Sequence, residues 1–209
     1  IGIITIFIIY KVRYEEKLLK YKDKFIEHSV HEIKTPLSII NLNTQLRNKI
    51  FGEDKYSKKI EAAIKTLQNS YEDMTFLHTK KYISYNLEVL VLKNVLEKRV
   101  SYFKSVSTAQ GWVLNLEIDS NCLIRISQIE IERLIDNNLS NAIKYNKIAG
   151  FIKVKLNYNI LSIEDSGKGI EKENLKNLFE RYSRFDKSVG GFGIGLNIVS
   201  LIAKEYNLK

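Results

Sequence analysis

The sequence contains one cysteine, one proline and no apolar run long enough to cross a membrane. The single Cys122 excludes an internal disulfide framework and any zinc site built from cysteines, which fits a reducing, cytoplasmic setting. The glycine-rich segment 191–195 is not followed by the lysine and Ser/Thr of a Walker-type phosphate loop. No parallel βαβ unit surrounds it, so a dinucleotide-binding fingerprint is not supported either.

Positive charge is in excess, with 33 Lys and Arg against 24 Asp and Glu, a net charge of +9. Such a charge is compatible with nucleic acid, an anionic membrane surface or nucleotide phosphates as partners. The lysines are scattered along the chain, which favours an ordinary solvated surface. No nucleic-acid recognition motif is present, so we expect no nucleic-acid partner.

The apolar segment 1–10 is followed at once by basic residues. Ten residues are too few for a membrane span, which takes about 20, but Lys11 and Arg13 follow as positive charge does on the cytoplasmic side. We expect residues 1–10 to end a transmembrane helix and 11–21 to form a juxtamembrane helix. This would place the chain at the cytoplasmic face of the inner (cytoplasmic) membrane. A core strand or helix is the alternative.

Two segments carry apolar residues at alternating spacings of three and four, which is typical of helices that pack along a seam. The charged, Gly52-containing stretch Asn48 to Lys58 reads as the loop between them. Two helices alone bury too little surface, so we expect the hairpin, residues 22–78, to form a four-helix bundle as a dimer. The two stripes are Ile26, Val30, Ile33, Leu37, Ile40, Thr44 and Ile60, Ile64, Leu67, Tyr71, Met74, His78.

Residues 79–86 break this pattern and are predicted to link the hairpin to a second domain, 87–209, of α+β class. Its glycine-punctuated segment up to Gly195 has no clear periodicity. Ser127 and Glu130 have the spacing of a helix capping box. The elements expected here are a helix over Leu90 to Lys104, strands over Trp112 to Ile118, Leu123 to Ile126, Gly150 to Tyr158 and Ile160 to Glu164, and helices from Ser127 and over Leu196 to Tyr206.

The sequence His31-Glu32-Ile33-Lys34-Thr35-Pro36 lies in the first predicted helix. His31 and Thr35 are four residues apart and share a face turned away from the seam, so we expect the imidazole to be exposed. A neutral imidazole is a good nucleophile, and the neighbouring Glu32 can take the proton from one ring nitrogen while the other attacks. Pro36 has no amide to bond the carbonyl of Glu32, which loosens or bends the helix there.

Polar residues of the helix from Ser127 fall in one angular sector, opposite an apolar sector. Asparagine carbonyls are hard oxygen ligands that suit Mg²⁺, and Lys144 can meet phosphate charge. Asp165 directly follows a strand, where its carboxylate can accept a hydrogen bond from an exocyclic amine. The glycines of 165–169 and 191–195 allow close approach of a ring and free helix amides for phosphate. The polar sector holds Asn137, Asn141, Lys144 and Tyr145, and the apolar sector Ile131, Ile135, Leu139 and Ala142.

Taken together, these segments resemble the sensor histidine kinases of two-component systems. The segment 31–37 is similar to their phosphoacceptor box, and His28 lacks the Glu-x-x-Thr-Pro that follows His31. Downstream, four segments in order resemble the N, G1, F and G2 boxes of the ATP-binding domain: Asn-x-x-x-Asn-Ala-x-Lys-Tyr from Asn137, Asp-x-Gly-x-Gly-Ile from Asp165, residues 178–185, and Gly-x-Gly-x-Gly-Leu from Gly191.

This resemblance implies a helical hairpin followed by a two-layer α+β sandwich of the histidine kinase/Hsp90/gyrase type. It also implies ATP with Mg²⁺, a homodimer, and a response regulator receiver domain whose aspartate takes the phosphoryl group. In the hairpin, the resemblance implies that His31 is phosphorylated, that Glu32 is its acid/base partner and that Thr35 positions water when the regulator is dephosphorylated.

In the ATP-binding domain, the resemblance implies that Asp165 recognises adenine, Asn141 binds Mg²⁺, and Asn137 and Lys144 contact the phosphates. Tyr145 would flank the nucleotide and Arg184 would approach the γ-phosphate. The glycines implied to make close backbone contact with the nucleotide are Gly167, Gly169, Gly191, Gly193 and Gly195.

Two features depart from the family pattern. Phe192 stands where a small hydroxyl residue is common, and the sequence ends at Lys209, where family members usually continue with a further strand pair. An ATPase of the gyrase, Hsp90 or MutL kind would share the asparagine and glycine boxes but has no use for the His31 helix. A catalytically silent dimeric scaffold is the other alternative, and titration with an ATP analogue separates it from a kinase.

Overall fold

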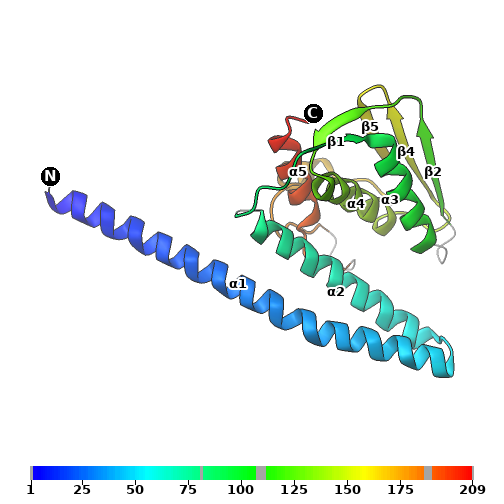
Figure 1. Cartoon of the computed structure of the whole chain (residues 1–209), viewed down its shortest axis with the longest axis horizontal. Helices are drawn as coiled ribbons and strands as arrows, with labels where there is room; N and C mark the ends of the chain where they lie inside the picture. Colours follow the sequence, from blue (N-terminus) through cyan, green and yellow to red (C-terminus); the bar gives the residue numbers. More distant parts are fainter. Residues whose placement is uncertain (1, 81, 107–111, 186–189, 209) are drawn as a thin grey trace. The chain divides into compact units, whose positions relative to one another are not determined.

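A computed structural model describes residues 2–80, 82–106, 112–185 and 190–208; the side chains of residues 18–31 are among those outside the description. The chain divides into two compact units, Ile1–Ile83 and Ser84–Lys209. The first is a pair of helices and the second combines helices with two small sheets (Figure 1). Each unit is described below by itself.

The first unit is an antiparallel hairpin of α1 (Gly2–Phe51) and α2 (Lys55–Thr79). The predicted hairpin is therefore present, but the loop predicted over Asn48 to Lys58 is wrong because only residues 52–54 lie outside the helices. Gly52 has φ +78°, a conformation that favours glycine. The carboxylate of Asp54 then caps α2 by accepting from the amide of Ser57 at 2.7 Å, so a charged turn can be this short.

The predicted seam is only partly covered within the hairpin. Leu37 and Ile64 are buried, with exposures of 6% and 4%. Between the two helices, the side-chain Nδ2 of Asn48 donates to Oε1 of Glu61 at 2.6 Å. The stripe residues Ile33, Ile40, Ile60 and Leu67 remain about half exposed. The hairpin thus buries one row of the seam and leaves the adjacent row of large apolar side chains in solvent. Ile26 and Val30, predicted in the same stripe, have side chains outside the description.

The apolar beginning of the chain forms part of α1. Across the described residues, no helix combines the length and the apolar character that a membrane crossing requires. That residues 1–10 end a transmembrane helix stays a prediction.

The second unit is an α+β domain, as the sequence predicts, and its three-stranded sheet is mixed. The strand order is β2-β4-β5, with β2 parallel to β4 and β4 antiparallel to β5, and β1 pairs antiparallel with β3 in a separate two-stranded sheet. The elements are β1 (Glu88–Val91), α3 (Leu92–Val106), β2 (Val113–Ile118), β3 (Leu123–Ile126), α4 (Gln128–Lys144), β4 (Phe151–Asn157), β5 (Ile160–Asp165), the 3₁₀ helix η1 (Lys172–Asn177) and α5 (Gly195–Glu205).

The core of this unit lies between the three-stranded sheet and its helices. Alternate residues of β4 are completely buried, as period-two patterning requires for a sheet covered on one side. The predicted apolar sector of α4 is buried as well, and α4 packs against both α5 and β5. Fully buried side chains here include Ile135, Leu139, Ile152, Val154, Leu156, Ile198 and Ile202.

Two predicted local features are wrong. Residues 88–91 form strand β1 rather than the start of a helix at Leu90, because their backbone pairs with β3. Ser127 is the N-cap residue of α4, but its side chain makes no capping hydrogen bond. Glu130 is instead 1% exposed and accepts a hydrogen bond from the hydroxyl of Tyr206, so a tertiary partner replaces the local capping box.

Candidate nucleotide-binding site

The polar face of α4 is the foundation of the candidate site. Asn137, Asn141, Lys144 and Tyr145 are all partly exposed, while the opposite face of the helix is buried. The side-chain Nδ2 of Asn137 donates to the backbone carbonyl of Arg133 at 3.0 Å, which fixes the Asn137 side chain on the helix. The carboxamide of Asn141 makes no hydrogen bond to another described residue. Its oxygen is therefore available to a ligand.

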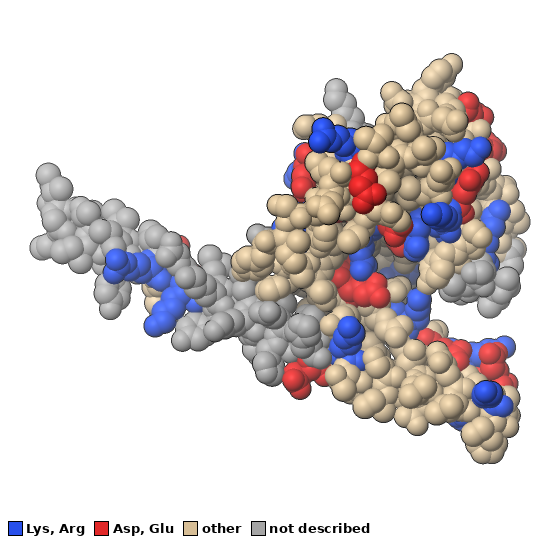
Figure 2. All heavy atoms as spheres, in the orientation of Figure 1, with Lys and Arg blue, Asp and Glu red and all other residues tan. Residues whose placement is uncertain are grey.

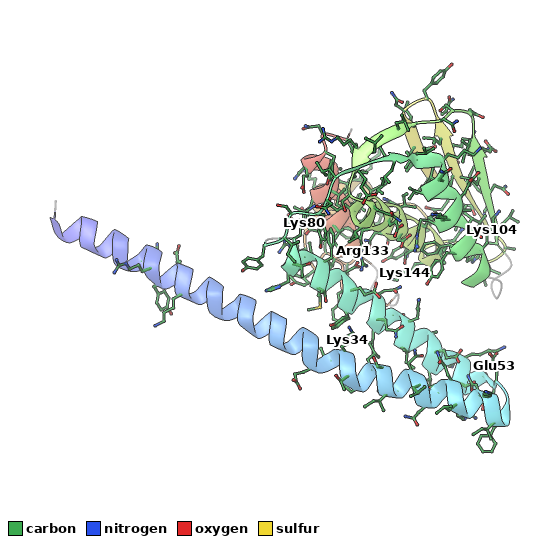
Figure 3. All side chains as sticks on the ribbon, viewed as in Figure 1. Lys34, Glu53, Lys80, Lys104, Arg133 and Lys144 are labelled. Atoms are coloured by element: carbon green, nitrogen blue, oxygen red, sulfur yellow. The ribbon has the colours of Figure 1, made fainter. Side chains whose placement is uncertain are left out.

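The glycines of 191–195 lie against this face. A methyl group added to the α-carbon of Gly195 would lie 2.3 Å from Oδ1 of Asn137, and one added to Gly191 would lie 2.4 Å from Nζ of Lys144. Either methyl group would force the polar side chain that it meets to move, more easily for the long Lys144 than for Asn137. Glycine therefore allows the N-terminal end of α5 to approach two polar residues of α4, and Lys144 lies near the C-terminal end of α4 (Figure 3).

The segment after β5 meets the same helix at its C-terminal end, next to Lys144. A methyl group added to Gly167 would lie 2.4 Å from the carbonyl oxygen of Tyr145, and Oδ1 of Asp165 accepts a hydrogen bond from the amide of Gly167 at 2.8 Å. Asp165 is exposed, so its carboxylate is accessible while one oxygen is held by the backbone. Gly169 has φ +71° and an open environment.

A small hydrogen-bond network fixes the start of this segment. Oγ of Ser166 donates to Oδ1 of Asn146 and accepts from the amide of Phe151, both at 2.9 Å. Nδ2 of Asn146 donates to the carbonyl of Phe151 at 3.0 Å. Since Asn146 follows Tyr145 and Ser166 follows Asp165, the network ties two predicted site residues together. Sequence reasoning missed it, although both residues are polar neighbours of assigned positions.

Residues 178–185 lie beside the second glycine segment. The amide of Tyr182 donates to the carbonyl of Gly193 at 2.9 Å, and Tyr182 has φ +66°, a strained conformation for a residue with a side chain. A methyl group added to Gly193 would lie 3.0 Å from Cγ of Arg184. Arg184 is thereby placed next to the glycines that precede α5. Residues 186–189, which follow shortly after Arg184, lie outside the description.

An ion pair supports the back of the site. Nε of Arg99, on α3, donates to Oδ1 of Asp136 at 2.7 Å, and a second guanidinium nitrogen bonds the other carboxylate oxygen. Burial raises the pKa of Asp136 above its usual value, against the influence of Arg99, which favours the ionised carboxylate. This pair fastens α3 to α4 immediately before Asn137.

Side chains of both charge signs are mixed on the visible face of this unit. Lys and Arg lie interspersed with Asp and Glu on the face of the α+β unit that Figure 2 shows. On the sheet, Nζ of Lys153 is 2.8 Å from a carboxylate oxygen of Glu117, and this contact lowers the pKa of Glu117. Some of the lysines on the sheet are thus paired with a carboxylate.

The predicted phosphoacceptor residues lie in the hairpin. His31, Glu32 and Thr35 are all on α1, and Pro36 lies within the same helix. Glu32 and Thr35 are exposed. The side chain of His31, whose exposure the sequence predicts, lies outside the described residues, as does that of His28.

Most of the second unit is similar to a family of known domains. Residues 126–209 match the family described as histidine kinase-, DNA gyrase B- and HSP90-like ATPases. Among solved structures, full-length ShkA in complex with AMPPNP aligns with 87% of this chain and 40% of its own at 19% identity and TM-score 0.65. The histidine kinase AdeS of Acinetobacter baumannii aligns over 83% and 86% of the two chains at 24% identity and TM-score 0.55. These structures share the fold.

Curated sensor proteins and histidine kinases are similar to nearly the whole chain. Sensor protein RprX of Bacteroides fragilis is 30% identical over 96% of this chain and 42% of its own length. Sensor histidine kinase WalK of Bacillus subtilis is 25% identical over 95% and 34%, and histidine protein kinase SaeS of Staphylococcus aureus is 30% identical over 90% and 58%. The chain therefore spans less than two thirds of each of these relatives. The resemblance to sensor histidine kinases predicted from the motifs is confirmed along nearly the whole chain.

Proposed function

We propose that this chain is the cytoplasmic kinase portion of a membrane-bound sensor histidine kinase. The observation that carries the proposal is the convergence on α4 of two separate segments: Asn137 and Lys144 lie against the glycines at the start of α5, and Tyr145 lies against Gly167 beside Asp165. In this arrangement Asp165 binds the adenine amino group, and the free amides at the start of α5 bind phosphate. Tyr145 flanks the nucleotide.

The residues present fit a bound Mg²⁺ ion. The unpartnered carboxamide oxygen of Asn141 lies between Asn137 and Lys144 on the polar face of α4, and neutral oxygen ligands suit this cation. When bound, the ion neutralises phosphate charge. Lys144 and Arg184 add positive charge on either side of the glycine segment, so positioning and charge neutralisation supply most of the rate enhancement.

The reaction we propose is phosphoryl transfer from ATP to His31. A ring nitrogen of His31 forms a bond to the γ-phosphorus while the bond from phosphorus to the bridging oxygen of ADP breaks, and Glu32 accepts the proton of the other ring nitrogen. The phosphohistidine then passes its group to an aspartate of a response regulator receiver domain. Thr35 would position water when the same protein dephosphorylates that regulator.

The domain organisation follows from this function. Residues 22–78 would form the dimerisation and phosphotransfer domain, 79–86 the linker and 87–209 the ATP-binding domain. The exposed row Ile33, Ile40, Ile60 and Leu67 supports a homodimer, because a second hairpin would cover it. Residues 1–10 would end a transmembrane helix that places this portion at the cytoplasmic face of the inner membrane, with 11–21 as the juxtamembrane helix.

Labelling with γ-³²P-ATP tests the proposal. The His31→Gln variant should incorporate no label because the attacking nitrogen is lost, while its binding of an ATP analogue stays unchanged. His28→Gln is the matched control and should be labelled as the unmodified chain is. The phosphate should be acid-labile and base-stable, as expected for phosphohistidine. Undiminished labelling of His31→Gln would refute the assignment.

A further inference from the structure

Asn197 lies in the first turn of α5 and makes two hydrogen bonds to one distant segment. Its Nδ2 donates to the carbonyl of Phe179 at 2.9 Å, and its Oδ1 accepts from Nε of Arg181 at 3.0 Å. A single carboxamide therefore uses its donor and its acceptor at once, on a main-chain group and on a side chain two residues further along. Neither an alanine nor a carboxylate at this position could make both bonds.

The same segment is held to the glycines before α5 at a second point. Tyr182 donates its amide to the carbonyl of Gly193 at 2.9 Å, and the left-handed backbone of Tyr182 persists because its surroundings fix it. Gly193 in turn fits closely against the carbonyl of Ser183 and Cγ of Arg184, where an added methyl group would lie at 2.5 Å and 3.0 Å. The two attachment points bracket Arg181 and precede Arg184.

We propose that Asn197 is a positioning residue that holds the segment Phe179–Arg184 on α5 and thereby sets the Arg184 guanidinium at the phosphate-binding end of this helix. The inference rests on the proposed function, since it assumes that nucleotide phosphate binds there. Asn197 itself need not touch the nucleotide. Its effect passes through the backbone of the segment, and it concerns the terminal phosphate that Arg184 approaches.

A long, flexible arginine loses considerable conformational entropy when it binds phosphate, so a fixed backbone in the segment that precedes it reduces the main-chain part of that cost. Without the Asn197 hydrogen bonds, Arg184 must be ordered at the expense of binding free energy. This cost falls on ATP, which carries the γ-phosphate, and not on ADP. The ratio of ATP-analogue to ADP affinity is therefore the property that Asn197 controls.

Equilibrium binding of AMPPNP and of ADP, each with Mg²⁺, to the full chain tests this. Asn197→Ala should raise the Kd for AMPPNP by about tenfold, the worth of a charge-assisted hydrogen bond, and that for ADP by less than about twofold. Asn197→Asp should be similarly selective, because it keeps the acceptor for Arg181 but loses the donor to Phe179. Ser200→Ala, on the same helix, is the matched control and should leave both constants unchanged.

A double variant isolates the route of the effect. In an Arg184→Ala background the Asn197→Ala change should cause no further loss of AMPPNP affinity, because the group that it positions is absent. Equal losses for AMPPNP and ADP, additive losses in the double variant, or unchanged AMPPNP binding would each overturn the inference. If the unmodified chain binds neither nucleotide, the proposed function itself fails, which is a distinguishable result.

Discussion

The contact between Glu130 and Tyr206 fixes how far α5 lies along α4. Glu130 is in the first turn of α4 and Tyr206 is the C-cap residue of α5, while Asn137 and Gly195 meet at the opposite end of α5. The hydrogen bond from the Tyr206 hydroxyl to the buried Glu130 carboxylate therefore fixes the position of α5. The beginning of α5 is part of the candidate nucleotide site. Burial and this hydrogen bond raise the pKa of Tyr206 to about 12.

This shift predicts a specific pH dependence of stability. A free tyrosine ionises near pH 10, so between about pH 10 and about pH 12 the unfolded chain has released a proton that the folded chain still holds. The stabilisation is fully present below pH 10 and is lost as the pH rises through the folded pKa. Urea unfolding from pH 8 to 12 should show this loss in the full chain and a smaller one in Tyr206→Phe.

At pH 8 the same Tyr206→Phe variant should be less stable by about 1–3 kcal/mol, because the buried Glu130 loses a hydrogen-bond donor. Tyr158→Phe is a suitable control, since Tyr158 is 79% exposed. Identical pH profiles for the unmodified chain and Tyr206→Phe would contradict the role given to this hydroxyl.

At the scale of the element, sequence periodicity predicts what is decided within one helix or strand. The buried face of α4 and the alternating burial in β4 can be predicted from the sequence, because burial follows the period of the helix or strand. Strand β1 is not predicted, because it has only four residues and its hydrogen-bonding partner β3 lies more than thirty residues further along. The helical pattern of the following residues therefore dominates the interpretation.

The same distinction holds for the candidate site. The asparagines, aspartate and glycines stand at fixed spacings in continuous segments, so their grouping can be predicted from sequence. The attachment by Asn197 and the network of Ser166 with Asn146 join residues 16 to 20 positions apart, through side chains with no distinctive spacing. Such contacts depend on the final packing of strands and helices, which local patterns do not specify.

Glycine substitutions test the packing between α4 and α5. Gly195→Ala would force the Asn137 carboxamide away from its position, because the new methyl group would lie 2.3 Å from Oδ1. We expect the Kd for AMPPNP to rise by about tenfold or more, the worth of at least one displaced hydrogen-bonding group. Nucleotide titration by calorimetry measures this.

Gly52→Ala is the control for that experiment. Gly52 has φ +78° with no atom near a built methyl group, so alanine there strains the hairpin turn by about 1–2 kcal/mol without touching the ATP-binding unit. Nucleotide affinity should stay unchanged. An equal loss of affinity in both variants would mean that the effect of Gly195→Ala is not local.

For the whole molecule, the uncovered row of the hairpin predicts assembly. Ile40 is 50% exposed beside the seam, and Leu42, two residues on, is 56% exposed on nearly the opposite side of α1. If a second hairpin covers the row Ile33, Ile40, Ile60 and Leu67, Ile40→Glu should convert the dimer to monomer, because it would bury an unpaired charge. Leu42→Glu should leave the dimer intact. Light scattering after size-exclusion chromatography distinguishes the two outcomes.

Helix α1 runs without interruption from Gly2 to Phe51, about 75 Å at 1.5 Å per residue. A rotation or axial displacement of the first turn of α1 would therefore reach His31 through continuous helix. The first missing backbone hydrogen bond is at Pro36, about one turn beyond His31, because proline has no amide to donate to the carbonyl of Glu32. The backbone hydrogen bonding of α1 is thus uninterrupted before His31 and lacks its first bond just after it, so we expect bending of the helix to concentrate next to this residue.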